Sequence, residues 1–152
     1  MSFSRAVAIL ALVCLPAISA AGGAYAQAKG PAPAKQPPKE EKTFPKDSTW
    51  TLRAMNGKPV SPGMEATLKI DGQFRGSGFA GCNTWSATMW PVRAQHFAVG
   101  PMAVTKKQCA APLMAFERSY LSALHTQPVW DVVNGMLEVK SPAGTLSFVR
   151  GF

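Results

Sequence analysis

The most reactive side chains in this sequence belong to three cysteines and two histidines. Cys14 lies in an N-terminal stretch that we predict to be removed, which leaves Cys82 and Cys109. In an oxidising compartment, an even pair of cysteines predicts a disulfide. The loop that this bond would close stabilises a fold by roughly 3–4 kcal/mol, because the unfolded chain loses entropy.

These residues do not indicate a catalytic or metal site. A metal site needs several histidine, cysteine or carboxylate ligands, and neither His96 nor His125 lies in such a cluster. Cys109 precedes a predicted helix, whose N-terminus would stabilise a thiolate. His125 follows at the other end of that helix, about 20 Å away. We therefore predict no catalytic residue, no metal and no cofactor, and a thiol-dependent enzyme is the least favoured function.

The four tryptophans leave two interpretations open. Aromatic residues on strands usually fill a core. Trp85 and Trp90 are separated by an odd number of residues, so a regular strand places them on opposite faces and exposes one of them. Because tryptophan is enriched at interfaces, Trp90 and the nearby Arg93 are our candidates for a surface contact with a partner.

The first 26 residues have the pattern of a secretory signal peptide. Arg5 precedes an apolar run over residues 6–15, and the small residues around Ala24 and Ala26 predict cleavage after Ala26. An uncleaved anchor is the alternative, but the run is short for a membrane span. Val13, directly before Cys14, makes lipoprotein anchoring unfavourable. We expect a periplasmic or secreted protein with no transmembrane span after cleavage.

The region 27–47 is rich in proline and lysine and poor in large apolar residues, which predicts a flexible linker. The whole chain has a formal net charge of +8. Its basic residues are dispersed, with only Lys106 and Lys107 adjacent in the predicted domain, so the footprint of a nucleic-acid-binding protein is missing. We expect a monomer whose partner is an envelope protein or an anionic envelope component.

The domain over residues 48–152 alternates short strands with tight turns. Gly81 and Asn83 are residue types that tolerate a sharp corner. Leu113, Phe116 and Tyr120 fall on one face at helical spacing, so a helix is predicted over 112–124. We expect an α+β fold, with a strongly curved antiparallel sheet or partial barrel of about eight short strands and one helix. The predicted strands are 50–54, 66–70, 73–79, 84–90, 92–99, 130–133, 136–140 and 145–150.

Several segments, taken in order along the chain, resemble the META domain family, which includes a bacterial heat-shock protein. They are the strand-like region 50–60, the residues Gly81, Cys82 and Asn83, then Thr105 with Cys109, and an amphipathic helix that contains Glu117. The resemblance covers about residues 48–152. It implies a small mixed α/β domain of envelope or secreted proteins, an association with stress response and antibiotic tolerance, and no established catalytic reaction.

We therefore favour a non-enzymatic, envelope-associated binding domain that acts in the stress response. The alternative is an inhibitor of a lytic enzyme, similar to lysozyme inhibitors, because small secreted β-rich domains often serve in this way. Asn83 is expected to hydrogen-bond the backbone at its corner. Glu117 is expected to be solvated on the surface of the helix.

Overall fold

The structure is a computed structural model that describes residues 42–151. The predicted signal peptide, its cleavage site and residues 27–41 of the predicted linker lie outside the described residues. Within residues 42–151, no helix has the length and hydropathy needed to cross a membrane.

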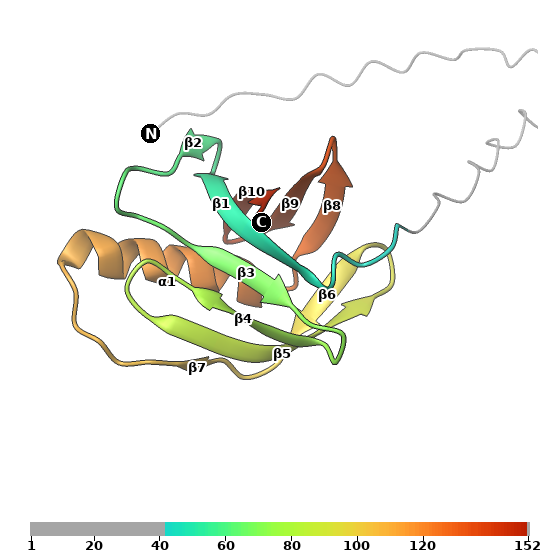
Figure 1. The fold of residues 1–152 in the computed structure, drawn as a ribbon, viewed down its shortest axis with the longest axis horizontal. Coiled ribbons are helices and arrows are strands. Elements are labelled where there is room, and N and C mark those ends of the chain that lie inside the picture. Colours follow the sequence, from blue (N-terminus) through green and yellow to red (C-terminus); the bar gives the residue numbers. More distant parts are fainter. Residues whose placement is uncertain (1–41, 152) are drawn as a thin grey trace, which may run out of the picture. The chain divides into compact units, whose positions relative to one another are not determined.

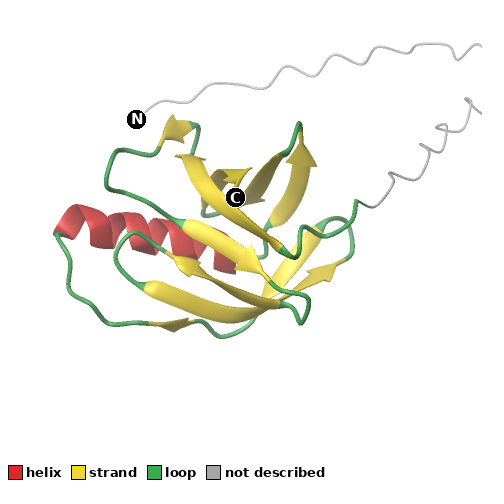
Figure 2. Ribbon diagram, in the orientation of Figure 1, coloured by secondary structure: helices red, strands yellow, loops and turns green. Residues whose placement is uncertain are grey.

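The described chain folds into a small β-barrel with one helix (Figures 1 and 2). Eight antiparallel strands follow one another in the order β10-β9-β8-β6-β5-β4-β3-β1, and β10 pairs with β1 to close the ring. The short strands β2 and β7 add to β1 and β5 from outside this ring. The predicted α+β partial barrel of about eight strands and one helix is confirmed. The elements are β1 (Ser48–Met55), β2 (Lys58–Pro59), β3 (Thr67–Ile70), β4 (Arg75–Phe79), β5 (Thr84–Val92), β6 (His96–Val99), β7 (Ala103–Val104), α1 (Ala111–His125), β8 (Val129–Val133), β9 (Met136–Ser141) and β10 (Gly144–Arg150).

Alternating apolar residues build the core of the barrel. On β1, Trp50 and Leu52 are buried, and Leu52 pairs with buried Phe148 on β10. The two Asn-Gly turns are both formed from left-handed residues, at Asn56 and Asn134 with the glycines that follow them. These turns connect β1 to β2 and β8 to β9. The sequence predicted both turns and the second hairpin, but not the short strand β2.

The helix α1 extends one residue beyond the predicted range at each end. Pro112 lies in its first turn, where the missing N–H removes no intrahelical hydrogen bond. The buried side of α1 includes Tyr120, Ala123 and Leu124, which pack against residues of the barrel interior. Tyr120 also donates a hydrogen bond of 2.8 Å from its hydroxyl to the carbonyl oxygen of Thr67.

The prediction that Pro91 ends the fourth strand is wrong, because β5 continues to Val92. Met89, two residues earlier, donates its N–H to Phe74 on the β4 side of the strand. Pro91 faces the same side at a point where β5 pairs with β6 alone. Its missing N–H therefore leaves no ladder hydrogen bond unmade, and proline is tolerated at such an edge.

The predicted strand 92–99 is wrong in its first half. Residues 93–95 form the turn between β5 and β6, and only the segment from His96 is a strand. The backbone at Ala94 and Gln95 is left-handed, with φ of 58° and 56°. Neither residue type signals this conformation as glycine or asparagine would, so the turn was not visible in the sequence.

The folded unit begins before the predicted boundary at Ser48. Phe44 is buried, and its ring packs against Phe74, Phe97 and Trp130, with centroids 5.5 Å apart in the last case. The end of the predicted linker therefore contributes an aromatic side chain to the core. A single apolar residue in a charged, proline-rich segment gives too weak a pattern to predict this.

Strand pairing around the barrel is sparse between β6 and β8. Only one register pair, His96 with Val129, connects these two strands. Backbone hydrogen bonds from Phe97 to Pro128 and from Trp130 to Gln95 support the junction. The C-terminal end of α1 lies near this junction, because His125 lines the same hollow as His96 and Val129.

Candidate functional site

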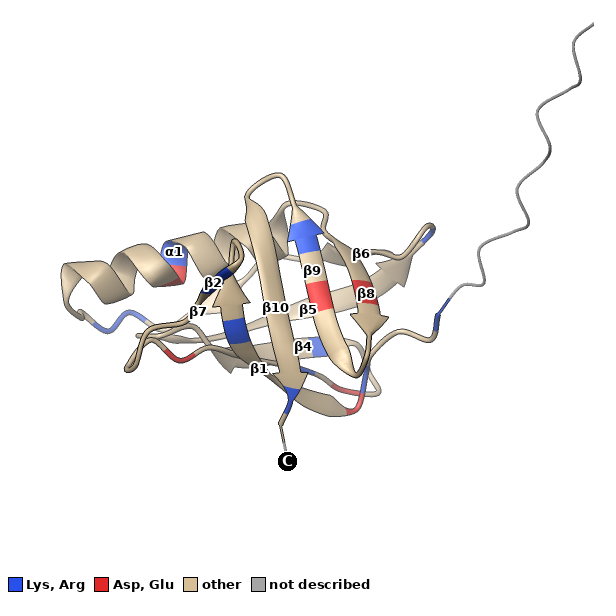
Figure 3. Cartoon of the chain, turned by 90° about the horizontal axis from the view of Figure 1, so that it is seen from above, with Lys and Arg blue, Asp and Glu red and all other residues tan. Residues whose placement is uncertain are grey.

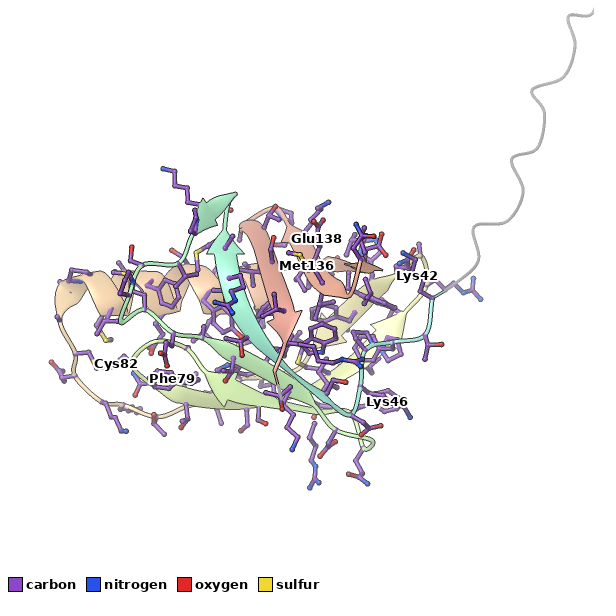
Figure 4. The ribbon with its side chains drawn as sticks, turned by 45° about the horizontal axis from the view of Figure 1, so that its top comes forward. Lys42, Lys46, Phe79, Cys82, Met136 and Glu138 are labelled. Carbon is purple, nitrogen blue, oxygen red and sulfur yellow. A yellow bond between two sulfur atoms is a disulfide. The ribbon has the colours of Figure 1, made fainter. Side chains whose placement is uncertain are left out.

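The corner between β4 and β5 brings together the residues on which the family resemblance rests. Cys82 is labelled there beside Phe79 in Figure 4. Gly81 has a φ of 93°, and a Cβ added to it would lie 2.7 Å from Cδ1 of Phe116 on α1. Both the backbone angle and the close approach of the helix require glycine.

Asn83 uses its whole amide at this corner. Its Oδ1 accepts hydrogen bonds from the Lys107 backbone N–H at 2.7 Å and from the Thr105 hydroxyl at 2.8 Å. Its Nδ2 donates to the carbonyl oxygen of Lys107 at 3.3 Å and to Oε1 of Glu117 at 3.2 Å. The side chain is 2% exposed, so it has no capacity left for a ligand. Asn83 connects the corner to the segment before α1 and to α1 itself.

The expectation that Glu117 is solvated is wrong. The residue is 6% exposed and faces the corner from α1. Its Oε2 accepts the backbone N–H of Asn83 at 2.8 Å, in addition to the bond from Nδ2. A buried carboxylate is costly unless it is hydrogen-bonded, so these two bonds explain how the helix can carry it.

Cys82 and Cys109 are placed at bonding distance, with Cα atoms 6.0 Å apart. This separation is usual for a disulfide. The bond would join the corner to the residue that shortly precedes α1, across the same gap that Asn83 spans. The side chains of Asn83 and Glu117 are hydrogen-bonded within this corner and to the segment before α1, which indicates a structural connection.

The exposed apolar residues point to a different surface. Trp85 is buried at 3%, whereas Trp90 is 41% exposed on the opposite face of β5. Register places Val92 opposite His96, His96 opposite Val129, and Val129 opposite Lys140. We call this surface the β5–β9 face and define it by Trp90, Val92, His96, Val129 and Lys140. Val92 and Val129 are 43% and 37% exposed, so three large apolar side chains are open to solvent on one face.

Two hollows lie along the β5–β9 face. One of about 520 Å³ is lined by Val92, Arg93, His96 and Gln127, among others. A second of about 720 Å³ shares His96 and Gln127 with the first and also includes Val129. The two hollows are therefore contiguous, and their volumes lie in the range of ligand-binding clefts.

The charges around this face are mostly paired. Lys140 contacts Glu138 at 2.7 Å, and Lys42 contacts Asp131 at 2.5 Å. Hydrogen bonding to Glu138 raises the pKa of Lys140, and the hydrogen bond from Lys42 lowers the pKa of Asp131. Figure 3 shows the acidic positions of β8 and β9 side by side. Arg93 forms no ion pair with the described residues, so it is the unpaired cation at the edge of the face.

The structure separates the two groups of predicted site residues. Trp90 and Arg93 lie near one end of β5, and the Gly81–Asn83 corner lies at the other end, about 25 Å away along an extended strand. Sequence reasoning missed the contributions of His96 and Val129 to the face, since only the strand pairing brings them beside β5. Among residues 42–151, no group of three or more histidine, cysteine or carboxylate side chains is placed to hold a metal ion.

Comparisons with known proteins agree on the fold. A protein from Burkholderia xenovorans, solved by NMR, has a TM-score of 0.58 and 22% identity, with 77% of this chain and 98% of that chain covered. A second NMR structure has a TM-score of 0.58 and 21% identity, covering 67% of this chain and 87% of that one. A crystal structure of a DUF4847 family protein from Bacteroides vulgatus has a TM-score of 0.50 and 11% identity, covering 67% and 91%.

The structural similarities, at these low identities, concern the fold alone. No curated protein matches the chain. The sequence pattern of the META domain matches residues 43–151, which is most of the chain and nearly all of the part that the structure describes. The match begins one residue before buried Phe44, in agreement with the start of the folded unit. The chain therefore belongs to the META domain family.

Proposed function

We propose that this META domain is a non-enzymatic binding module of the periplasm or cell exterior, which docks an envelope protein during stress. Its docking surface is the β5–β9 face together with Arg93. The partner presents apolar side chains at the centre of the contact and acidic groups at its edge. The disulfide between Cys82 and Cys109 belongs to this proposal, since an exported chain meets an oxidising environment.

The observation that carries the proposal is the exposure of Trp90 and Val92 beside an unpaired arginine. Tryptophan and arginine are among the residue types that are enriched at the energetic centre of protein interfaces. Val129 extends the apolar surface across the junction of β6 and β8. Charge complementarity supports an acidic partner, because the chain has a net charge of +8 and Arg93 has no carboxylate neighbour among the described residues.

A site-specific cross-link tests this surface. A photoreactive phenylalanine replaces Trp90 in one variant and Met136 in another, and each is irradiated in envelope extract with and without heat stress. Met136, labelled in Figure 4, is a matched control, because it is 38% exposed but pairs with Val133 at the turn end of the β8–β9 hairpin, away from the pair of Val129 and Lys140. We expect one stoichiometric partner from the Trp90 position alone, and loss of that partner when Arg93→Glu is added.

Affinity measurements with the captured partner complete the test. Trp90→Ser and Arg93→Glu should each weaken binding about tenfold or more, as for residues at an interface centre. Met136→Ser should leave binding unchanged. Equal capture from both positions, or an unchanged affinity in Trp90→Ser, would show that the β5–β9 face is not the docking surface. Export is tested separately by N-terminal sequencing of the protein recovered from the periplasm or medium, which should begin at Gln27.

A further inference from the structure

The two histidines of this chain come from different elements but line the same hollow. His96 begins β6, and His125 is the last residue of α1. Both line the hollow of about 720 Å³, together with Val129 and Lys140. They are far apart in the sequence, so only the packing of α1 beside the junction of β6 and β8 brings them to one cavity.

The lining of this hollow contains no carboxylate. Two acidic residues lie next to the pair of Val129 and Lys140 along the strands, where Asp131 pairs with Glu138. Each of these carboxylates already contacts a lysine, Asp131 through Lys42 and Glu138 through Lys140. Within each ion pair, the charges of the lysine and the carboxylate cancel. The adjoining hollow is also lined by Arg93, which has no ion-pair partner among the described residues. Apart from Arg93, the charge that a ligand meets in the hollow therefore depends on the two imidazoles.

The geometry fixes the orientation of one imidazole. Nδ1 of His96 lies 3.3 Å from the carbonyl oxygen of Gln127. When Nδ1 carries the proton and donates to this oxygen, Nε2 is left free for a second partner, and it becomes a donor when the ring is charged. His125 lies in the last turn of α1, on the other side of the hollow's lining. Imidazole gains its charge between about pH 8 and pH 5.

We infer that the hollow between His96 and His125 binds an oxyanion, a carboxylate or a phosphate group, and that it binds this group more tightly as the pH falls. The inference rests on the proposed function, because the hollow is part of the β5–β9 face and the oxyanion belongs to the docked partner. Beyond the docking surface, the inference names the chemical group that the partner contributes, and it predicts that docking becomes tighter as the pH falls. Neutral imidazoles leave the apolar contacts of Trp90 and Val92 in place without this anion contact.

Anion titrations of the whole chain from Gln27 onward test the inference directly. Sulfate represents a phosphate group and formate represents a carboxylate, and both stay ionised over the range used. Chemical shifts of the backbone amides are followed at about pH 5.5 and about pH 7.5 at constant ionic strength. We expect the largest shifts at Gln127 and Val129, and a dissociation constant at least fivefold lower at the acidic pH, since each charged imidazole contributes a contact of about this size. The tighter of the two anions identifies the kind of group.

Three variants separate the contributions. His96→Gln/His125→Gln should remove the pH dependence of the dissociation constant. Arg93→Gln should weaken binding at both pH values by the same factor, because arginine stays charged throughout. Trp90→Ser should leave sulfate and formate binding unchanged. A pH dependence that survives in the double histidine variant, or shifts centred on Lys106 and Lys107, would overturn the inference.

The two proposals can fail independently. If Trp90→Ser has no effect on partner capture while anions still bind the hollow at low pH, the docking surface is wrong and the anion site stands. If partner capture depends on Trp90 but neither anion shifts the hollow residues, the docking surface stands and the anion site is wrong. The double histidine variant keeps two exposed or half-buried polar residues at these positions, and its folding is checked by the dispersion of its amide spectrum.

Discussion

Replacing Asn83 with alanine removes the side chain that connects three segments of the fold. The amide joins the β4–β5 corner to Thr105, to both backbone groups of Lys107 and to Glu117 on α1. Alanine leaves the Lys107 N–H without its acceptor, and it removes one of the two donors that hold the buried carboxylate of Glu117. Water reaches this place poorly, because Asn83 and Glu117 are 2% and 6% exposed.

The expected loss of stability follows from the number and kind of these bonds. A hydrogen bond contributes about 1 kcal/mol net, and about 1.5–3 kcal/mol where one partner is charged. Four bonds, one of them to a carboxylate, give a predicted loss of about 4.5–6 kcal/mol for Asn83→Ala. A domain of this size has about 5–15 kcal/mol in total. Since 1 kcal/mol moves the melting temperature by about 4–8 °C, we expect a decrease of about 15 °C or more.

Urea unfolding followed by tryptophan fluorescence and by circular dichroism measures this loss. Asn134→Gly is the matched control, because Asn134 is exposed and left-handed, with φ of 51°, so that glycine fits the same turn. The control should change the free energy of unfolding by less than about 0.5 kcal/mol. A loss below about 1.5 kcal/mol in Asn83→Ala would refute the idea that this amide holds the corner, the preceding loop and the helix together.

Substitutions at four further positions test other parts of the structure. Cys82→Ser, Cys109→Ser and the double variant should each lose about 3–4 kcal/mol of stability in denaturant unfolding, and additive losses would count against a bond between the two residues. Gly81→Ala should lower the free energy of unfolding by more than about 2 kcal/mol in the same assay, because the backbone of Gly81 is left-handed and the ring of Phe116 on α1 occupies the space of a Cβ. A near-neutral result would contradict this packing. Burial raises the pKa of Tyr120 in the fold. Above about pH 10, the tyrosine therefore ionises in the unfolded chain but not in the folded protein, and the wild type should lose stability as the pH rises further. Tyr120→Phe should cost about 1 kcal/mol at neutral pH through the lost bond to Thr67, and its disadvantage should shrink above about pH 10, whereas a constant difference would show that the phenol ionises in the fold.

Much of the fold could be predicted from local signals. The Asn-Gly turns at Asn56 and Asn134, the helical spacing before Tyr120 and the alternation around Trp50 each depend on a few neighbouring residues. The errors occurred where tertiary context decides. Pro91 continues a strand because its nitrogen faces an unpaired edge, and no local pattern contains that information.

The candidate site was predictable only in part. The odd separation of Trp85 and Trp90 was enough to expect one exposed tryptophan, and the structure exposes Trp90. The neighbours of Trp90 across the face depend on pairing between strands that are separated by the whole helix, as for His96 and Val129. Glu117 looked like an ordinary surface carboxylate because the helix pattern does not show which groups meet its polar side.

Closure of the barrel by its first and last strands has a consequence for how the chain folds. Trp50 on β1 pairs with Arg150 on β10, so contacts that complete the ring join residues from opposite ends of the domain. Such distant contacts raise the contact order and slow folding. Until β10 is in place, β1 and β9 both present unpaired edges that favour pairing with other chains. A newly made chain is therefore most vulnerable to aggregation before its last seven-residue strand is added, and a chaperone that covers β1 would protect it at that stage.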